Sequence, residues 1–156
     1  MKPFFPMFVD LSDRRALVVG AGNIAARRVK TLTAFCGVIT VVAPAIDPAL
    51  EGLGATLIRR RYAPSDLEGM DLVLAATDDA ALNAEIAAAC RARGVPVNVV
   101  SDQRLCDFFF PGVAVSGPLV AGVTASGTDH ALARRATEAV RDALGRVGGQ
   151  GAGNGE

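Results

Sequence analysis

A glycine-rich turn between a short apolar run and a helical pattern constrains the fold of this chain more than any other feature. Residues 16–19 have the composition of a buried parallel strand, and the turn Gly20-Ala21-Gly22-Asn23-Ile24-Ala25 follows directly. The turn has the pattern G-x-G-x-x-A. Its first glycine allows a tight turn, its second lets a pyrophosphate approach the backbone, and its alanine lets the new helix lie close to the strand. The sequence therefore predicts a strand–helix–strand unit that binds a dinucleotide.

Further apolar runs alternate with helical patterns along the chain. Strands are predicted at residues 38–42, 56–59, 72–76 and 96–100, and a helix at 80–93. The first crossover helix is predicted to continue to about Cys36 and to end at Gly37 in a left-handed conformation. This alternation predicts an α/β fold with a doubly wound parallel sheet. The strand ends at Gly20, Thr77 and Ser101 should meet at its carboxyl edge, where such sheets bind ligands.

The pattern changes near residue 111, so we divide the chain into three parts. Residues 1–111 are predicted to form the nucleotide-binding domain, with Phe4, Phe5 and Phe8 packed on it as an arm. Residues 112–145 contain two short strands and a helix. Two strands are too few for an independent sheet, so we predict a homodimer formed through this region. Residues 146–156 are glycine-rich and are predicted to be a disordered tail.

Composition excludes several classes of function. Sixteen Lys and Arg residues balance sixteen Asp and Glu residues, so no long-range field favours nucleic acid or an anionic membrane. No apolar run is long enough to span a membrane, and the N-terminus has no signal-peptide pattern. The three cysteines are scattered and the one histidine, His130, is isolated, so we predict no disulfide framework and no metal site. A cytoplasmic location is the simplest interpretation.

One element of the dinucleotide pattern is missing. An acidic residue that binds the adenosine ribose is expected near the end of the second strand, but the chain has Val41-Val42-Ala43-Pro44 there. The residues alone therefore leave the choice between NAD and NADP open, and a glycine turn that binds no ligand remains an alternative.

Several segments together resemble a known family. Residues 5–11 (FPMFVDL), the glycine turn in ALVVGAGNIAARRVKTL, residues 38–44, LVLAATDDAALN, VNVVSD and LCDFFFPG occur in unbroken order. Over about residues 4–145 the chain resembles the precorrin-2 dehydrogenase module of siroheme synthases. This resemblance implies an NAD-binding Rossmann domain, a dimerisation region exchanged between subunits, and oxidation of precorrin-2, a tetrapyrrole, to sirohydrochlorin. In some members the same cleft also inserts ferrous iron.

The resemblance also implies which residues bind NAD. Backbone contacts to the dinucleotide are expected at Gly20, Gly22, Asn23 and Ile24. The adenosine end is expected at Ala43, Pro44 and Ala45, and Thr77 with Asp78 is expected to close over the cofactor.

The chain departs from the family at the position of its proposed acid/base. An aspartate usually follows N-V-V, but here Ser101 stands there and Asp102 comes next. A serine has little basicity near neutral pH, whereas the pKa of a carboxylate in a partly dry cleft can be raised. We therefore predict that Asp102 has the catalytic role at this edge. The alternatives are that positioning alone supports hydride transfer, or that Asp102 is only a turn residue.

A tetrapyrrole substrate carries carboxylates that a neutral protein must bind locally. Arg104, Arg134 and Arg135 are the predicted substrate-binding residues, because guanidinium groups bind carboxylates in a bidentate manner. Two further departures, at Ala125 and at Asp129-His130, make iron insertion doubtful. The alternative function is a catalytically degenerate module that binds NAD or a tetrapyrrole as a carrier or sensor. A reductase of the Tyr-x-x-x-Lys type is excluded, because Tyr62 is the only tyrosine and has no lysine at that spacing.

Overall fold

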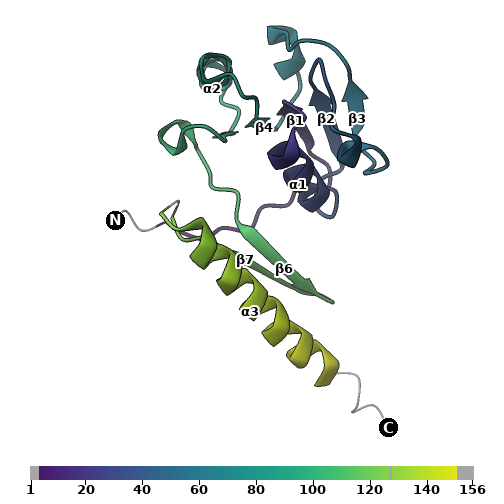
Figure 1. The fold of residues 1–156 in the computed structure, drawn as a ribbon, viewed down its shortest axis with the longest axis vertical. Coiled ribbons are helices and arrows are strands. Elements are labelled where there is room, and N and C mark those ends of the chain that lie inside the picture. Colours follow the sequence, from purple (N-terminus) through teal and green to yellow (C-terminus); the bar gives the residue numbers. More distant parts are fainter. Residues whose placement is uncertain (1–3, 127, 151–156) are drawn as a thin grey trace. The chain divides into compact units, whose positions relative to one another are not determined.

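The computed structural model describes residues 4–126 and 128–150, and the chain divides into two units (Figure 1). Phe8–Phe108 form one unit, and residues 4–7 join the segment from Phe109 onward in the other. We expected the boundary after residue 111, and in the structure the larger unit ends at Phe108. Within the second unit Phe4 packs on Phe109, with ring centroids 4.3 Å apart, which explains why the N-terminal segment belongs there. The side chains of Phe5 and Phe8, expected in the same arm, are 90% and 74% exposed.

The larger unit is built on one parallel sheet, which confirms the predicted α/β fold. Its strand order is β3-β2-β1-β4-β5, and all four neighbouring pairs are parallel. The strands are β1 (Arg15–Val19), β2 (Val38–Val42), β3 (Thr56–Ile58), β4 (Leu72–Ala75) and β5 (Val97–Val99). Three 3-10 turns lie in its loops: η1 (Pro48–Leu50), η2 (Pro64–Leu67) and η3 (Gln103–Leu105).

The strand order reverses between β1 and β4, so the two crossover helices cover opposite faces of the sheet. Helix α1 (Asn23–Leu32) connects β1 to β2, and α2 (Ala80–Arg93) connects β4 to β5 (Figure 1). On the α2 face, Ile86, Ala87 and Cys90 pack into one buried cluster with inward-facing residues of the strands. On the other face, α1 buries Ala25 and Val29 completely. Both faces of the sheet are therefore apolar, as central parallel strands require.

Helix α1 ends earlier than predicted. Its last residue is Leu32, and residues 33–35 form turns rather than a further helical turn. Gly37 is not among the residues with a positive φ, so the predicted left-handed cap is wrong. Glycine is needed there for a different reason: a Cβ at this position would lie 2.1 Å from the carbonyl oxygen of Ser12. The backbone before β2 thus packs directly against the backbone before β1.

Strand β5 lies at the edge of the sheet, and the chain covers that edge with its own side chains. The Asp107 carboxylate accepts a hydrogen bond from Val97 N at 3.0 Å, and Cys106 Sγ accepts one from Val99 N at 3.2 Å. Asp107 N in turn donates to the Val97 carbonyl at 2.9 Å. These contacts satisfy backbone groups that an open edge would offer to another strand.

The smaller unit is a hairpin with one helix alongside it (Figure 1). β6 (Gly112–Ser116) and β7 (Leu119–Val123) pair in an antiparallel manner, and α3 (His130–Gln150) packs on them. Residues 146–150, which we expected to be disordered, therefore continue the helix. Gly148 fits here because a Cβ would lie 2.9 Å from Ser116 Oγ, so the glycine lets α3 stay close to the hairpin. Residues 151–156 of the predicted tail lie outside the described residues.

None of the helices within residues 4–126 and 128–150 combines the length and apolar character needed to cross a membrane.

The packing of α3 on β6 gives a first testable prediction. A Cβ at Gly112 would lie 2.1 Å from Oγ1 of the buried Thr137, whereas a Cβ at Gly145 would meet nothing within 4 Å. We expect Gly112→Ala to lower the free energy of unfolding by roughly 1–3 kcal/mol, as overpacking does. Gly145→Ala is the matched control and should leave stability unchanged or raise it by up to about 1 kcal/mol. Thermal and urea unfolding of the full chain measures both; equal stability of the two variants would contradict the described packing.

Candidate functional site

A cleft of about 1290 Å³ lies at the carboxyl edge of the sheet, entirely within the unit Phe8–Phe108. Its walls come from the loops that follow β1, β2, β3 and β4, from the start of α2, and from Val100 after β5. All nine predicted cofactor-binding residues line it: Gly20, Gly22, Asn23, Ile24, Ala43, Pro44, Ala45, Thr77 and Asp78. The structure therefore brings these residues together around one cavity.

Gly20 is held in place by backbone packing. Its φ is +102°, in the region that favours glycine, and its N–H donates to the Val42 carbonyl at 2.9 Å. A Cβ here would lie 2.4 Å from the Ala76 carbonyl oxygen. Gly20 thus allows the turn after β1 to pack against the end of β4 as well as to bend sharply.

Gly22 has a different role, because a Cβ there would meet nothing within 4 Å. Its φ of −88° is accessible to any residue. It is the N-cap of α1, and neither a side-chain cap nor an acidic residue occupies the first turn. Helix α2 is the contrast: Asp79 caps it by accepting hydrogen bonds from Ala81 N and Leu82 N at 2.9 and 3.0 Å. The N-terminus of α1 is therefore the one of these two that presents its N–H groups and positive dipole end to a ligand.

The loop after β2 forms another wall of the cleft. Ala43 is buried, Pro44 and Ala45 are exposed, and Asp47 N donates to the Ala21 carbonyl at 3.0 Å. This bond ties the loop to the glycine turn. The Asp47 carboxylate accepts a hydrogen bond from Ala49 N at 2.8 Å and so caps η1.

Thr77 and Ser101 are joined by the side chain of Asn83, a completely buried residue on α2. Asn83 Oδ1 accepts hydrogen bonds from Thr77 Oγ1 at 2.7 Å and from Thr77 N at 3.2 Å. Asn83 Nδ2 donates to the Thr77 carbonyl at 3.0 Å and to Ser101 Oγ at 3.1 Å. One amide thus fixes the ends of β4 and β5 relative to each other.

Asp102 does not have the raised pKa that we expected. Arg104 donates to both carboxylate oxygens, from Nη2 at 2.7 Å and from Nε at 3.0 and 3.2 Å, and its backbone N–H adds a bond of 2.9 Å. These bonds stabilise the ionised form and lower the pKa of Asp102 to about 2. The prediction of a raised pKa is therefore wrong: Asp102 caps η3 and pairs with Arg104 instead of lying in a dry pocket.

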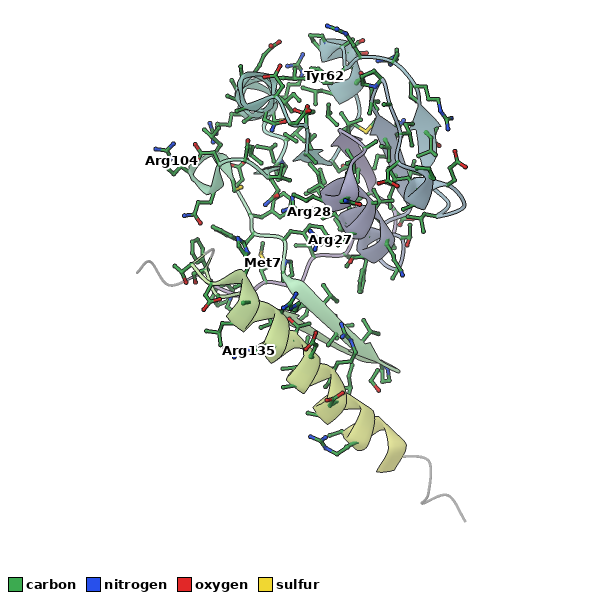
Figure 2. The ribbon with its side chains drawn as sticks, in the orientation of Figure 1. Met7, Arg27, Arg28, Tyr62, Arg104 and Arg135 are labelled. Carbon is green, nitrogen blue, oxygen red and sulfur yellow. The ribbon has the colours of Figure 1, made fainter. Side chains whose placement is uncertain are left out.

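The predicted substrate-binding arginines lie in both units. Figure 2 labels Arg104, which lies on η3. Its side chain is 85% exposed and is paired with Asp102. Arg134 and Arg135 are exposed on α3, in the other unit. Within the described residues, no group of three or more His, Cys, Asp or Glu side chains is arranged to hold a metal ion.

Sequence reasoning missed Asn83 and Arg28. Asn83 shares one face of α2 with Ile86, Ala87 and Cys90, and a polar residue on an otherwise apolar face is the signal that could have found it. Arg28, on α1, is partly buried, and this burial lowers its pKa. Its guanidinium donates to Asn98 Oδ1 on β5. No local pattern reveals that pair, because 70 residues separate its members.

The chain is similar to proteins of known family. The family model described as putative NAD(P)-binding matches residues 7–112. The siroheme synthase of Pseudomonas entomophila is 43% identical over 135 residues, which cover 84% of this chain and 29% of that protein. The siroheme synthase of Sodalis glossinidius is 39% identical over 145 residues, with coverage of 90% and 31%. The chain thus spans less than a third of the length of these relatives.

Two solved structures are also similar. "SirC, precorrin-2 dehydrogenase" superposes with a TM-score of 0.71 at 26% identity, covering 90% of this chain and 71% of that one. D-lactate dehydrogenase from Escherichia coli has a TM-score of 0.50 at 20% identity over 64% of this chain and 32% of that one, a likeness of fold alone.

The Asp102–Arg104 pair gives a prediction for titration. Replacing Arg104 by Gln removes the guanidinium, so the pKa of Asp102 should rise from about 2 towards its ordinary value of 3.8. Carboxyl-carbon NMR of the labelled chain measures this shift. Arg59→Gln, which removes a guanidinium paired with Glu51, is the matched control and should leave the titration of Asp102 unchanged. An unchanged pKa in Arg104→Gln would show that the pair is not formed in solution.

Proposed function

The chain belongs to the putative NAD(P)-binding family, and from this premise we propose that it is an NAD-dependent precorrin-2 dehydrogenase of siroheme synthesis. The observation that carries the proposal is the structural likeness to SirC, precorrin-2 dehydrogenase, over 90% of this chain. The identity to siroheme synthases supports the same pathway. Because those relatives are more than three times as long as the matched segment, we take from them only the pathway and the dehydrogenase step.

The residues of the cleft fit a dinucleotide. The open N-terminus of α1 suits the pyrophosphate, and the empty space beside Gly22 leaves room for it next to the backbone. Ala43, Pro44 and Ala45 offer small apolar contacts to the adenosine end. Thr77 and Asp78 lie across the cleft, at the start of the loop before α2. The nine residues assigned to the cofactor therefore offer backbone groups and small side chains, and Arg61 is the arginine among the residues that line the cleft.

When bound, NAD supplies the hydride acceptor at C4 of its nicotinamide. Oxidation of precorrin-2 to sirohydrochlorin removes a hydride and a proton, which yields NADH and H⁺. Asp102, with a pKa of about 2, is a weak base near neutrality, so we assign the proton to water at the open edge of the cleft. Asp102 then acts by holding Arg104, and Ser101 supplies a hydroxyl beside Val100. Catalysis here depends chiefly on alignment of the two reactants.

Carboxylates of the tetrapyrrole would be bound by Arg104. Arg134 and Arg135, exposed on α3 in the other unit, stay predicted carboxylate-binding residues. The exposed guanidinium of Arg104 keeps its outer face available while Asp102 fixes its orientation. Iron insertion is not part of this proposal.

The proposal includes a homodimer in a reducing cytoplasm. Although α3 packs on the two-stranded hairpin, Val115, Leu119 and Val120 are left exposed on it. A second copy of the chain would cover these side chains. The three cysteines are free thiols, which is consistent with a reducing compartment.

The direct test is the absorbance of NADH when the purified chain is mixed with NAD and freshly prepared precorrin-2. We expect NADH and sirohydrochlorin to appear in equal amounts. A chain that binds NAD and precorrin-2 without forming NADH would contradict the dehydrogenase and support the alternative, a carrier or sensor without turnover.

Substitutions at the two glycines of the turn should affect NAD binding and folding separately. Gly22→Ala places a methyl group in the space assigned to the pyrophosphate, so NAD affinity should fall by at least about tenfold, equivalent to ~1.4 kcal/mol. Thermal stability should fall only slightly, because the methyl group meets no protein atom and the one cost is that alanine is a poorer N-cap than glycine. Gly20→Ala is the contrasting variant and should destabilise the fold itself. Calorimetric titration with NAD and thermal unfolding give the two readouts. Unchanged NAD affinity in Gly22→Ala would contradict the assigned pyrophosphate site.

A further inference from the structure

The amide of Asn83 uses its complete hydrogen-bonding capacity. A carboxamide can accept two hydrogen bonds at oxygen and donate two at nitrogen. Asn83 makes all four: two accepted from Thr77 N and Oγ1, one donated to the Thr77 carbonyl, and one donated to Ser101 Oγ. It does so with a side chain that is completely buried, where an unpaired polar group is costly.

The direction of these four bonds is not interchangeable. A backbone N–H can only donate and a backbone carbonyl can only accept, so Thr77 determines which end of the Asn83 amide is oxygen and which is nitrogen. The nitrogen end therefore faces Ser101. Because Nδ2 is a donor only, Ser101 Oγ must accept this bond.

A serine hydroxyl has one proton to donate. Since Asn83 occupies an acceptor position of Ser101 Oγ, the hydroxyl proton must be directed away from Asn83. Ser101 is exposed and directly follows Val100, which lines the cleft. Ser101 itself is not among the lining residues, so its proton is available at the carboxyl end of β5, one residue beyond the lining of the cleft.

We propose that Asn83 is a positioning residue that fixes Ser101 as a hydrogen-bond donor to an oxygen acceptor on a ligand in the cleft. The inference rests on the proposed function for the identity of the ligands. Two of them carry suitable acceptors: the carboxamide of the nicotinamide in NAD, and the carboxylates of the tetrapyrrole. The geometry also explains how a serine can be useful at this edge without acting as a base.

Two substitutions test the two parts of this arrangement. Ser101→Ala removes the donor, and Ser101→Thr keeps a hydroxyl at the same place. Asn83→Asp keeps the shape of the side chain but replaces both N–H donors by an acceptor oxygen, so the Ser101 proton should turn towards the new carboxylate. Ser65→Ala, on the exposed 3-10 turn η2, is the matched control for loss of a serine hydroxyl.

We expect Ser101→Ala to raise the dissociation constant of either NAD or precorrin-2 by about 3- to 10-fold, the effect of one hydrogen bond. Ser101→Thr should restore most of the lost affinity. A rise in the dissociation constant of NAD would place the acceptor on the nicotinamide. A rise in the KM or dissociation constant of precorrin-2, with NAD binding unchanged, would place it on the tetrapyrrole. Ser65→Ala should change neither.

The double variant distinguishes positioning from a merely structural role. If Asn83 acts through Ser101, Asn83→Asp should change the affected constant several-fold in the wild-type background and hardly at all in Ser101→Ala. Its loss of thermal stability should appear in both backgrounds. If the two effects on the ligand constant multiply instead, Asn83 does not act through Ser101, and the proposal is overturned.

Ser101 is exposed, so we expect Ser101→Ala to fold. This variant alone therefore tests whether Ser101 donates to a ligand, even if the Asn83 variants do not fold. Wild-type values for NAD affinity, precorrin-2 affinity and turnover in Ser101→Ala would overturn the proposal. The absence of NADH formation by the wild-type chain would instead contradict the proposed dehydrogenase. The dissociation constants of NAD and precorrin-2 would then still decide the role of Ser101.

Discussion

The close approach of the β1 turn to the end of β4 is the contact on which the cleft depends. Gly20 packs against the backbone of Ala76 with no room for a side chain between them. The strand order of the sheet reverses between β1 and β4. This contact therefore lies at the point of the carboxyl edge where such sheets bind ligands. Asn83 then secures the same edge from the α2 side by joining the ends of β4 and β5. Backbone packing and one buried amide thus define the shape of the cavity.

The electrostatics of the site depend on a small number of charged side chains in the cleft lining. The charged residues of the lining are mostly acidic, and two of them, Asp47 and Asp79, use their carboxylates to cap η1 and α2. An anionic ligand is therefore served by the open helix end of α1 rather than by a basic patch, which agrees with a chain of zero net charge. Arg61 is an exposed cation in the lining, and Arg104 is another on η3, where the ionised Asp102 holds it in one orientation.

Local patterns predicted the parts of the fold that local interactions determine. Helix α2 has the predicted bounds, and Gly94 ends it with a φ of +67°. These bounds were predictable because the residues that cap the helix directly flank its apolar pattern in the sequence. Gly37 was misinterpreted because the atom that requires a glycine there is the carbonyl of Ser12, which only tertiary packing brings near. The cleft lining was predictable from a motif and a family resemblance. The sequence marks Asn83 only as a polar residue on the apolar face of α2. Its partners, and the Asp102–Arg104 pair, depend on side-chain geometry that no motif encodes.

The two glycines of the turn divide the demands of structure from those of ligand binding. Gly20 meets the protein's own backbone, whereas the space beside Gly22 is empty of protein atoms. A folded chain therefore strongly requires glycine at the first position, whereas the open space beside the second is needed only by a ligand. During evolution a descendant could lose the cofactor through drift at one residue and keep this architecture intact. The residue at position 22 therefore indicates better than the overall fold whether a related chain still binds the cofactor.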